Sequence, residues 1–216
     1  MRVPARKIRP VRGRNYRCKI SRSKSLGITH SESLLERDYV RLCNFDPTIK
    51  EIHFQPIGIR FHYKGRKRRY FPDYLVITND NGYVLVEVKL KKFVDTNLNK
   101  AKFLAAKQLC SEKGWNFQVV TEDQIRPGYL QRNIKLLLEV KCFELTPSVS
   151  EYIKTIINYH GPLSVMELRE VCKIVDASLV MRNLFKLIYA QEVCTELIEQ
   201  QLTDNSLLWV PQFRGS

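Results

Sequence analysis

The sequence predicts an α/β fold, in which a mixed β-sheet is flanked by helices and is followed by a small domain of short helices and a hairpin. Up to about residue 143, segments with alternating apolar side chains interchange with segments of helical periodicity, in the order helix, three strands, helix, strand, helix. That order is typical of a mixed sheet with helices packed against it. Short helical segments and two short strand patterns fill the rest.

The length of 216 residues allows one medium domain and one small domain. We place a basic N-terminal arm at 1–27, the α/β domain at 28–143 and a docking domain at 148–216. The first 24 residues hold ten Lys and Arg and no acidic residue. We expect this arm to contact DNA phosphates, and the alternative is a solubilising tail.

The formal net charge of +14 indicates a polyanionic partner, nucleic acid before an anionic membrane. No run of about 18 apolar residues and no secretory signal pattern is present, so we expect a cytoplasmic protein without membrane contact. The six cysteines are scattered without a Cys-x-x-Cys motif, which indicates reduced thiols. The four histidines lack metal-ligand spacing, so we expect a catalytic metal to have oxygen ligands.

The first predicted helix covers residues 31–44 and begins at Thr29 or Ser31. Its polar arc contains Arg37, Asp38, Arg41 and Asn44. Glu36 falls inside the opposite, apolar arc, where a carboxylate needs a partner such as a metal or a lysine. The alternative is a boundary glutamate that reaches solvent. For Glu32, one turn earlier, a capping role is expected.

The following elements alternate between strands and helices. Residues 51–63 form a strand pattern, and a hairpin follows at 70–90. A helix at 97–113 ends at Gly114 and turns one side to the core, formed by Ala101, Leu104, Ala105, Gln108 and Leu109. A strand at 116–121 and a helix at 129–140 complete the domain.

The hairpin carries the candidate catalytic residues. Side chains alternate along a strand, so Glu87 and Lys89 share a face. A tight turn near residues 80–82 brings Asp73 opposite about residues 88–90. The two carboxylates can hold Mg²⁺ while the ammonium faces an attacking water or the scissile phosphate. The alternative is an edge hairpin with a solvated charged row.

Two basic groups are expected to bind DNA. The first is in the arm and consists of Arg6, Lys7, Arg9, Arg12, Arg14 and Arg17. The second directly precedes Asp73 and consists of Arg66, Lys67, Arg68 and Arg69. A basic hairpin loop beside a carboxylate site would anchor the phosphate backbone near the metal, and the alternative is a solvated loop.

Five motifs in this order resemble the TnsA endonuclease subunit of heteromeric bacterial transposases, of the PD-(D/E)XK nuclease superfamily. The motifs are Glu36-Arg-Asp, Asn44-Phe-Asp-Pro47, Phe54-Gln-Pro56, Phe71-Pro-Asp-Tyr-Leu-Val76 and Val86-Glu-Val-Lys89. The resemblance covers residues 28–143 and implies a restriction-endonuclease-like fold. It also implies cleavage of the 5′ ends of a transposon, while a DDE transposase, TnsB, cuts and joins the 3′ ends. Gln55 matches the family pattern, and we interpret it as structural.

The resemblance further implies the roles of the site residues. Asp73, Glu87 and the backbone carbonyl of Val88 would bind one or two Mg²⁺ ions, for which Mn²⁺ can substitute. Lys89 would orient the water or stabilise charge on the phosphate, and Glu36 would complete the acidic metal site. The best-known member of the family has Gln at the position of Glu87, so the metal shell here would be closer to that of restriction-type nucleases.

The last region predicts a winged-helix-like domain, with helices ending near Tyr159, at 164–172 and at 178–190, and a strand pair of 192–198 with 207–210. Ser148 or Ser150 is the expected cap of the first helix. The supposed recognition helix offers few cations, and acidic residues gather near the wing. The resemblance implies contact with the ATP-dependent regulator TnsC, and DNA binding is the alternative.

Three functions therefore follow from the sequence. The first is a Mg²⁺-dependent endonuclease that cuts double-stranded transposon ends with a DDE partner. The second is a free-standing nuclease of the same fold, of the restriction or junction-resolving type. The third is an inactive DNA-binding scaffold, against which the complete set of Asp73, Glu87 and Lys89 argues.

Overall fold

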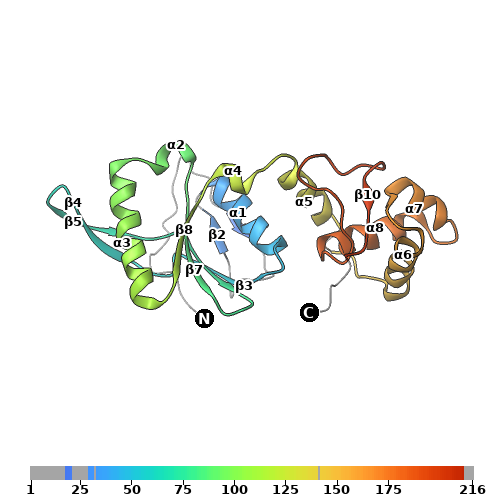
Figure 1. Ribbon diagram of the computed structural model, residues 1–216, viewed down its shortest axis with the longest axis horizontal. Coiled ribbons are helices and arrows are strands. Elements are labelled where there is room, and N and C mark those ends of the chain that lie inside the picture. The colour runs from blue at the N-terminus through green and yellow to red at the C-terminus, as the bar shows by residue number, and fades with distance from the viewer. Residues whose placement is uncertain (1–17, 21–28, 32, 141, 212–216) are drawn as a thin grey trace. The chain divides into compact units, whose positions relative to one another are not determined.

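The computed structural model describes residues 18–20, 29–31, 33–140 and 142–211. The chain divides into two compact units at the peptide bond between Arg126 and Pro127 (Figure 1). The predicted DNA-binding residues of the arm lie outside the described residues; they are Arg6, Lys7, Arg9, Arg12, Arg14 and Arg17. None of the described helices is long and apolar enough to cross a membrane.

The first unit is built on a four-stranded sheet with the strand order β3-β6-β7-β8. The strands are β3 (Ile49–Phe54), β6 (Tyr74–Thr78), β7 (Tyr83–Val88) and β8 (Asn116–Val120). Strand β6 is antiparallel to both neighbours, whereas β7 and β8 run parallel. The predicted mixed sheet is therefore confirmed.

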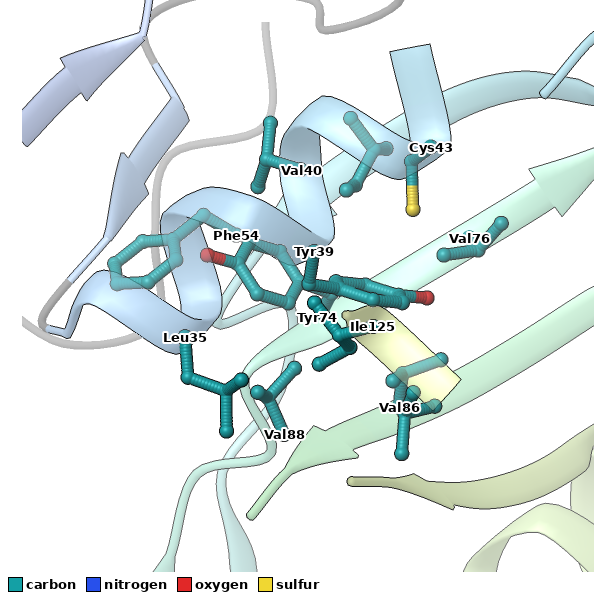
Figure 2. Close-up of a cluster of buried hydrophobic side chains, with 12 residues drawn as sticks. Leu35, Tyr39, Val40, Cys43, Phe54, Tyr74, Val76, Val86, Val88 and Ile125 are labelled. Atoms are coloured by element: carbon teal, nitrogen blue, oxygen red, sulfur yellow. The ribbon is translucent and has the colours of Figure 1, made fainter. Parts of the chain in front are cut away.

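Helices cover both faces of this sheet. They are α1 (Leu34–Phe45), α2 (Lys91–Val94), α3 (Asn97–Lys113) and α4 (Glu122–Ile125). Successive side chains of a strand point to opposite faces, so the sheet has a hydrophobic cluster on each face. Val76 and Val86 belong to the cluster under α1, and Leu75 and Leu85 belong to the cluster under α3. In the first cluster the Tyr74 ring lies 5.6 Å from that of Tyr39 (Figure 2).

The predicted strand at 51–63 is in fact two strands. The chain leaves β3 at Gln55, whose φ of 42° is left-handed, and then forms a separate hairpin. That hairpin consists of β4 (Ile59–Tyr63) and β5 (Arg66–Tyr70). The apolar alternation changes phase between Phe54 and Ile57, and Pro56 and Gly58 lie there, so the sequence contained a signal of the break that the prediction of one strand overlooked.

The first helix was predicted with the wrong start and the wrong polar face. Its N-cap is Ser33, whose side chain accepts a hydrogen bond from the Glu36 N–H, and not Thr29 or Ser31. Residues 29–31 instead form strand β2 (Thr29–Ser31), which pairs with β1 (Cys18–Ile20). Asp38 was expected to face solvent and is buried, because ion pairs cover that side of the helix.

The core-facing side of the helix at 97–113 was also predicted only in part. Ala101, Ala105 and Leu109 pack against the core as expected. Leu104 is 70% exposed and Gln108 is exposed, whereas Phe103, Ala106 and Cys110 are buried. The buried stripe of the helix is therefore rotated by about one residue relative to the prediction. Alanines and a cysteine on this helix are weakly apolar, so the sequence pattern did not define the stripe sharply.

The second unit contains four helices and a two-stranded pair among its described residues. They are α5 (Leu130–Leu138), α6 (Pro147–His160), α7 (Val165–Val171), α8 (Ala177–Tyr189), β9 (Leu163–Ser164) and β10 (Leu207–Leu208). Helix α5, which the sequence assigned to the α/β domain, packs on α8. Thr146, rather than Ser148 or Ser150, is the N-cap of α6.

The small sheet of this unit differs from the predicted strand pair. Strand β10 pairs with β9, and the expected pairing of 192–198 with 207–210 is reduced to one bridge between Cys194 and Trp209. Helices α6 to α8 with this sheet agree in order with the predicted winged-helix-like domain, which stays a prediction.

Candidate active site

Asp73 is fixed by the backbone at the point where β6 begins. Its carbonyl oxygen accepts a hydrogen bond from the Gln55 N–H at 2.8 Å, and its Oδ2 accepts one from the Val88 N–H at 2.8 Å. The register pairs Tyr74 with Val86, so Asp73 aligns with Glu87 and not with residues 88–90 as expected. The carboxyl group therefore lies beside the C-terminal end of β7.

Glu87 is almost completely buried on β7, with 2% exposure, and is held by two donors. Lys89 Nζ lies 2.9 Å from its Oε1, and the Tyr70 hydroxyl donates to its Oε2 at 2.7 Å. Lys89 follows two residues after Glu87, so both side chains leave the same face of the chain. A buried carboxylate is thus paired on both oxygens.

The electrostatics of the site reflect this crowding. Burial, together with the charges of Glu87 and Glu36, raises the pKa of Asp73 well above its ordinary value. Burial lowers the pKa of Lys89, but the Glu87 charge and hydrogen bond outweigh it and raise the net pKa. Burial and the adjacent Glu87 also raise the pKa of Tyr70, so its hydroxyl keeps its proton. Lys89 is therefore a cation and Tyr70 a donor at neutral pH.

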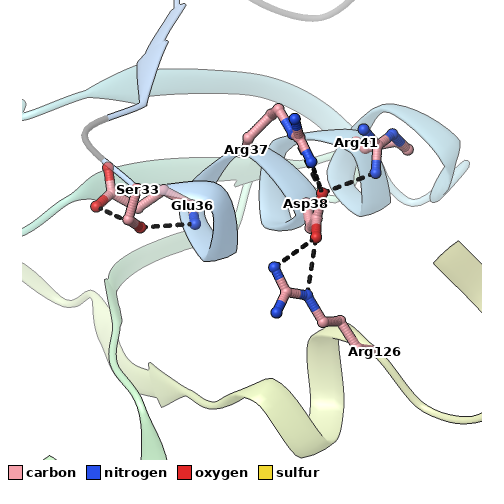
Figure 3. A network of polar contacts seen from close by, with 6 residues as sticks. All are labelled: Ser33, Glu36, Arg37, Asp38, Arg41 and Arg126. Carbon is pink, nitrogen blue, oxygen red and sulfur yellow. Dashed lines mark hydrogen bonds and ion pairs between the residues drawn. The ribbon is translucent and has the colours of Figure 1, made fainter. Parts of the chain in front are cut away.

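Glu36 is buried in the first turn of α1, on the side that faces this site. Its Oε1 accepts a hydrogen bond from the Ser33 hydroxyl at 3.0 Å (Figure 3). Its charge contributes to the raised pKa of Asp73, and it lines one pocket together with Val88 and Lys89. The structure thus brings Glu36 to the strand pair from a segment far away in the sequence.

The donor set can be compared with the requirements of a metal. Across the described ranges, no group of three or more His, Cys, Asp or Glu side chains is arranged to hold one ion. Asp73 and Glu87 nevertheless present two carboxylates beside a third, and their mutual repulsion is part of what raises the pKa of Asp73. The carboxylates of Asp73, Glu87 and Glu36 outnumber the one ammonium of Lys89, and such an excess of negatively charged oxygen donors suits a hard divalent cation such as Mg²⁺.

Two residues near the site were missed by the sequence analysis. Tyr70 ends the basic strand β5 and reaches Glu87. Lys102 projects from α3, with Nζ 5.5 Å from the centre of the Tyr70 ring. Burial lowers the pKa of Lys102, and the charges of Glu87, Lys89 and Asp73 also act on it. The sequence could not predict that Lys102 lies near the site, because the direction of a lysine on a helix depends on how the helix packs.

The second predicted basic group is exposed along β5. Its members are Arg66, Lys67, Arg68 and Arg69. In the described part of the chain none of them forms a salt bridge, and Arg68 and Arg69 lie over the rings of Tyr63 and Phe71 at 5.4 and 4.8 Å. Strand register places Arg69 opposite Arg60 and Lys67 opposite His62. The hairpin therefore presents a ladder of cations to solvent.

A second polar network ties α1 to the end of α4. Asp38 accepts hydrogen bonds from Arg41 at 2.8 Å and from Arg37 at 3.2 Å through Oδ1 (Figure 3). Its Oδ2 accepts from Arg126 Nε at 2.8 Å and Nη2 at 2.7 Å. Burial raises the pKa of Asp38, but the arginines outweigh it and lower the net pKa. The carboxylate therefore fixes three guanidinium groups.

Comparison with known proteins finds a family match in the strand-rich part of the first unit. Residues 46–122 match the family model described as the TnsA-like endonuclease N terminal. The match confirms the resemblance that the motifs predicted. It includes Asp73, Glu87 and Lys89, and it leaves out Glu36 and Arg126. No curated protein matches the chain.

Proposed function

Because residues 46–122 match a TnsA-like endonuclease domain, we propose that the protein cleaves the 5′ ends of a transposon during cut-and-paste DNA transposition. One observation supports the proposal most strongly. Inside the matched segment, Asp73 lies beside a buried Glu87 that pairs with Lys89 at 2.9 Å. Two carboxylates and a lysine at the meeting point of two strands are the groups that phosphodiester hydrolysis needs.

The residues have distinct tasks in the proposed reaction. A water attacks phosphorus in line with the leaving 3′ oxygen, so the products are a 5′ phosphate and a 3′ hydroxyl. Lys89 stays protonated because Glu87 lies next to it, so it can stabilise negative charge on the phosphate or orient the water. The Tyr70 hydroxyl holds the second oxygen of Glu87 and fixes the direction of that carboxylate.

Asp73 and Glu87, with the backbone carbonyl of Val88, are the residues we propose for holding Mg²⁺. Mn²⁺ would substitute, and Glu36 would complete the acidic metal site from α1. When bound, the ion supplies Lewis-acid polarisation of the phosphate and lowers the pKa of a water molecule. The hydrogen bond from Val88 N–H to Asp73 keeps the first carboxylate in place beforehand.

We propose that the β4–β5 hairpin holds the DNA backbone next to this site. Its cations are exposed, and Tyr70 connects the end of β5 directly to Glu87. Arginine and lysine contacts to phosphate fix the register of the duplex without reading its sequence. Recognition of the transposon ends would then come from a partner.

The proposed partners follow from the same resemblance. A DDE transposase, TnsB, would cut the 3′ ends, and the regulator ATPase TnsC would bind the second unit, with its winged-helix-like order of elements. Acidic residues gather near the predicted wing, namely Glu192, Glu196, Glu199 and Asp204, which favours docking of a protein over binding of DNA. A free-standing nuclease is the second candidate.

The experiment is cleavage mapping on transposon-end DNA with Mg²⁺, with and without the partner transposase. We expect 5′ nicks that require the partner, and we expect Asp73→Ala and Lys89→Ala to abolish them while folding and 3′ cutting persist. Asp95→Ala is the control, because this carboxylate is 89% exposed and pairs only loosely with Lys100 at 3.5 Å. Full 5′ cleavage by Asp73→Ala would refute the site, and strong cutting of unrelated DNA without the partner would favour a free-standing nuclease.

A further inference from the structure

A pocket of about 420 Å³ lies in the first unit and shares Glu36, Val88 and Lys89 with the candidate active site. Its apolar lining includes Leu34, Leu90 and Phe93. Its charged lining consists of Glu36, Lys89 and Arg126. Since Lys89 belongs to both the pocket and the catalytic group, a ligand here would lie next to the reacting phosphate.

The apolar lining is unusually exposed for large side chains. Phe93 is 46% exposed, Leu34 45% and Leu90 36%. The backbone holds Phe93 in place, because its N–H donates to the Leu90 carbonyl at 2.8 Å and its carbonyl accepts from Asn99 Nδ2 at 2.7 Å. The backbone of Phe93 is therefore fixed, while its half-exposed ring has Lys92 Nζ over it at 5.0 Å and still offers apolar surface to a ligand.

The charged lining is fixed as well. Asp38 accepts from the Arg126 side chain, whose Nε and Nη2 lie at 2.8 and 2.7 Å from its Oδ2. The Arg126 side chain is still 40% exposed. A guanidinium held on one edge keeps its other nitrogen for an anion, and arginine geometry suits a phosphate.

We propose that this pocket binds the nucleotide adjacent to the scissile phosphate, with its base against Phe93 and its own phosphate on Arg126. The inference rests on the proposed function. An aromatic ring and a fixed guanidinium lining the same pocket match the two parts of a nucleotide, and the shared Lys89 gives the pocket its place beside the cut. Asp38 acts as a positioning residue, because it touches the arginine and not the DNA.

The base contact is tested with a series of transposon-end duplexes that each carry one abasic nucleotide. Affinity is measured in Ca²⁺ without Mg²⁺, and cutting in Mg²⁺ is measured separately. We expect wild type to lose about tenfold in affinity at one position next to the cut. On intact DNA, Phe93→Ala should bind about as weakly as wild type binds the abasic duplex. On that abasic duplex, Phe93→Ala should lose no further affinity, whereas Phe93→Trp should behave like wild type on both.

The matched control for the ring is Phe143→Ala. Phe143 is 45% exposed, nearly the same as Phe93, and belongs to the second unit. Its replacement should leave the tenfold abasic effect unchanged, whatever it does to overall affinity. Because Phe93 is half exposed, its replacement should leave the fold intact, and thermal unfolding of each variant checks this directly.

The phosphate contact is tested with duplexes that each carry one neutral methylphosphonate. We expect Arg126→Gln to remove the effect of neutralising one phosphate beside the cut, and Asp38→Asn to weaken that effect. Arg126→Lys should retain part of it. Arg169→Gln is the control, because Arg169 is 41% exposed, close to the 40% of Arg126, and also pairs with an acidic residue, Asp204, though at 3.4 Å. It should leave the methylphosphonate profile of wild type intact.

The outcomes separate this inference from the proposed function. Additive losses for Phe93→Ala and the abasic nucleotide, or an unchanged profile for Arg126→Gln, would overturn the subsite even if the protein cuts transposon ends. They would indicate that another occupant, such as a segment of a partner protein, covers the pocket. If wild type binds DNA without cutting it, the proposed function fails, and the affinity profiles still decide whether a nucleotide lies on Phe93.

Discussion

Tyr70 links the basic hairpin to the carboxylate site through one hydrogen bond. Its hydroxyl donates to Glu87 Oε2 at 2.7 Å, and burial with the adjacent carboxylate raises its pKa, so it remains a donor across the working pH range. Such a contact fixes the direction of a carboxylate before a metal or substrate arrives. At the scale of the residue, the site is therefore supported by a side chain that has no acid or base role.

Replacing this hydroxyl gives a direct prediction. Tyr70→Phe should lower Mg²⁺-dependent cleavage by about tenfold, because losing a hydrogen bond to a metal-binding carboxylate typically weakens metal affinity or activity by that order. The measurement is a Mg²⁺ titration of the cleavage rate. Tyr63→Phe is the control, since Tyr63 lies at the opposite end of the hairpin, where its ring contacts Arg68. Equal cleavage by Tyr70→Phe and wild type would contradict the role.

Two glycines of the second unit differ in the space available for an added Cβ atom. A Cβ on Gly128, which has a φ of 45°, would lie 2.1 Å from the backbone carbonyl oxygen of Ile198, whereas a Cβ on Gly161, with a φ of 78°, would meet no atom within 4 Å. The first position combines backbone strain with a clash that no rotamer relieves.

Gly128→Ala should therefore destabilise the protein by about 3 kcal/mol or more, and Gly161→Ala, whose φ of 78° and ψ of −164° only glycine adopts readily, by about 2 kcal/mol. Thermal unfolding followed by circular dichroism measures both. The second variant is the matched control in the same unit, and equal losses for the two would show that the contact with Ile198 has no cost of its own.

At the scale of the element, helix α1 is held on two sides by different forces. Leu35, Tyr39 and Val40 pack into the core beneath it, whereas Asp38 binds the arginine that follows α4. The apolar stripe was evident from the sequence. The polar side was not, because Arg126 lies 88 residues away and its approach depends on the path of the sheet.

Asp38 gives stability a defined pH dependence. Its folded-state pKa lies below the ordinary 3.8, so the ionised carboxylate contributes its full stabilisation above that value and loses it as pH falls through the lowered pKa. We expect Asp38→Asn to reduce the free energy of unfolding by about 2 kcal/mol at pH 7. The difference from wild type should persist at pH 5 and shrink below pH 3.8.

Urea denaturation at these pH values measures the effect. Asp95→Asn is the matched control, because Asp95 is 89% exposed and its ion pair with Lys100 spans 3.5 Å. Exposed pairs of this kind contribute little. A loss of stability for Asp38→Asn that did not change with pH would show that the side chain stabilises α1 by packing rather than by charge.

At the scale of the whole molecule, the net positive charge favours the proposed polyanionic partner. The net charge of +14 predicts a strong salt dependence of DNA binding, because each lysine or arginine that binds a phosphate releases counterions. The exposed ladder on β5 supplies part of this charge close to the carboxylates. If the proposed function holds, binding should be largely electrostatic, and hydrolysis of the bound DNA would depend on Asp73 and its neighbours.

Neutralising the ladder tests this division. Changing Arg66, Lys67, Arg68 and Arg69 together to Gln should reduce the slope of log affinity against log salt by about 0.9 for each phosphate that the variant no longer binds. Fluorescence anisotropy across a KCl series measures the slope. The control changes Arg169 and Lys173 to Gln, since both pair with acidic residues of the second unit. An unchanged slope in the fourfold variant would exclude the hairpin from the DNA interface.

The sequence by itself determined the mixed sheet, the candidate residues Asp73, Glu87 and Lys89, and the TnsA-like resemblance, because these depend on local periodicity and short motifs. It also placed Glu36 on the buried face of a helix. Only the tertiary structure decided that Tyr70 reaches Glu87, that Lys102 lies over the Tyr70 ring and that Arg126 is held by Asp38. These contacts join residues that are far apart in the sequence, and no local sequence pattern predicts them. Their geometry follows from how helices pack on a twisted sheet.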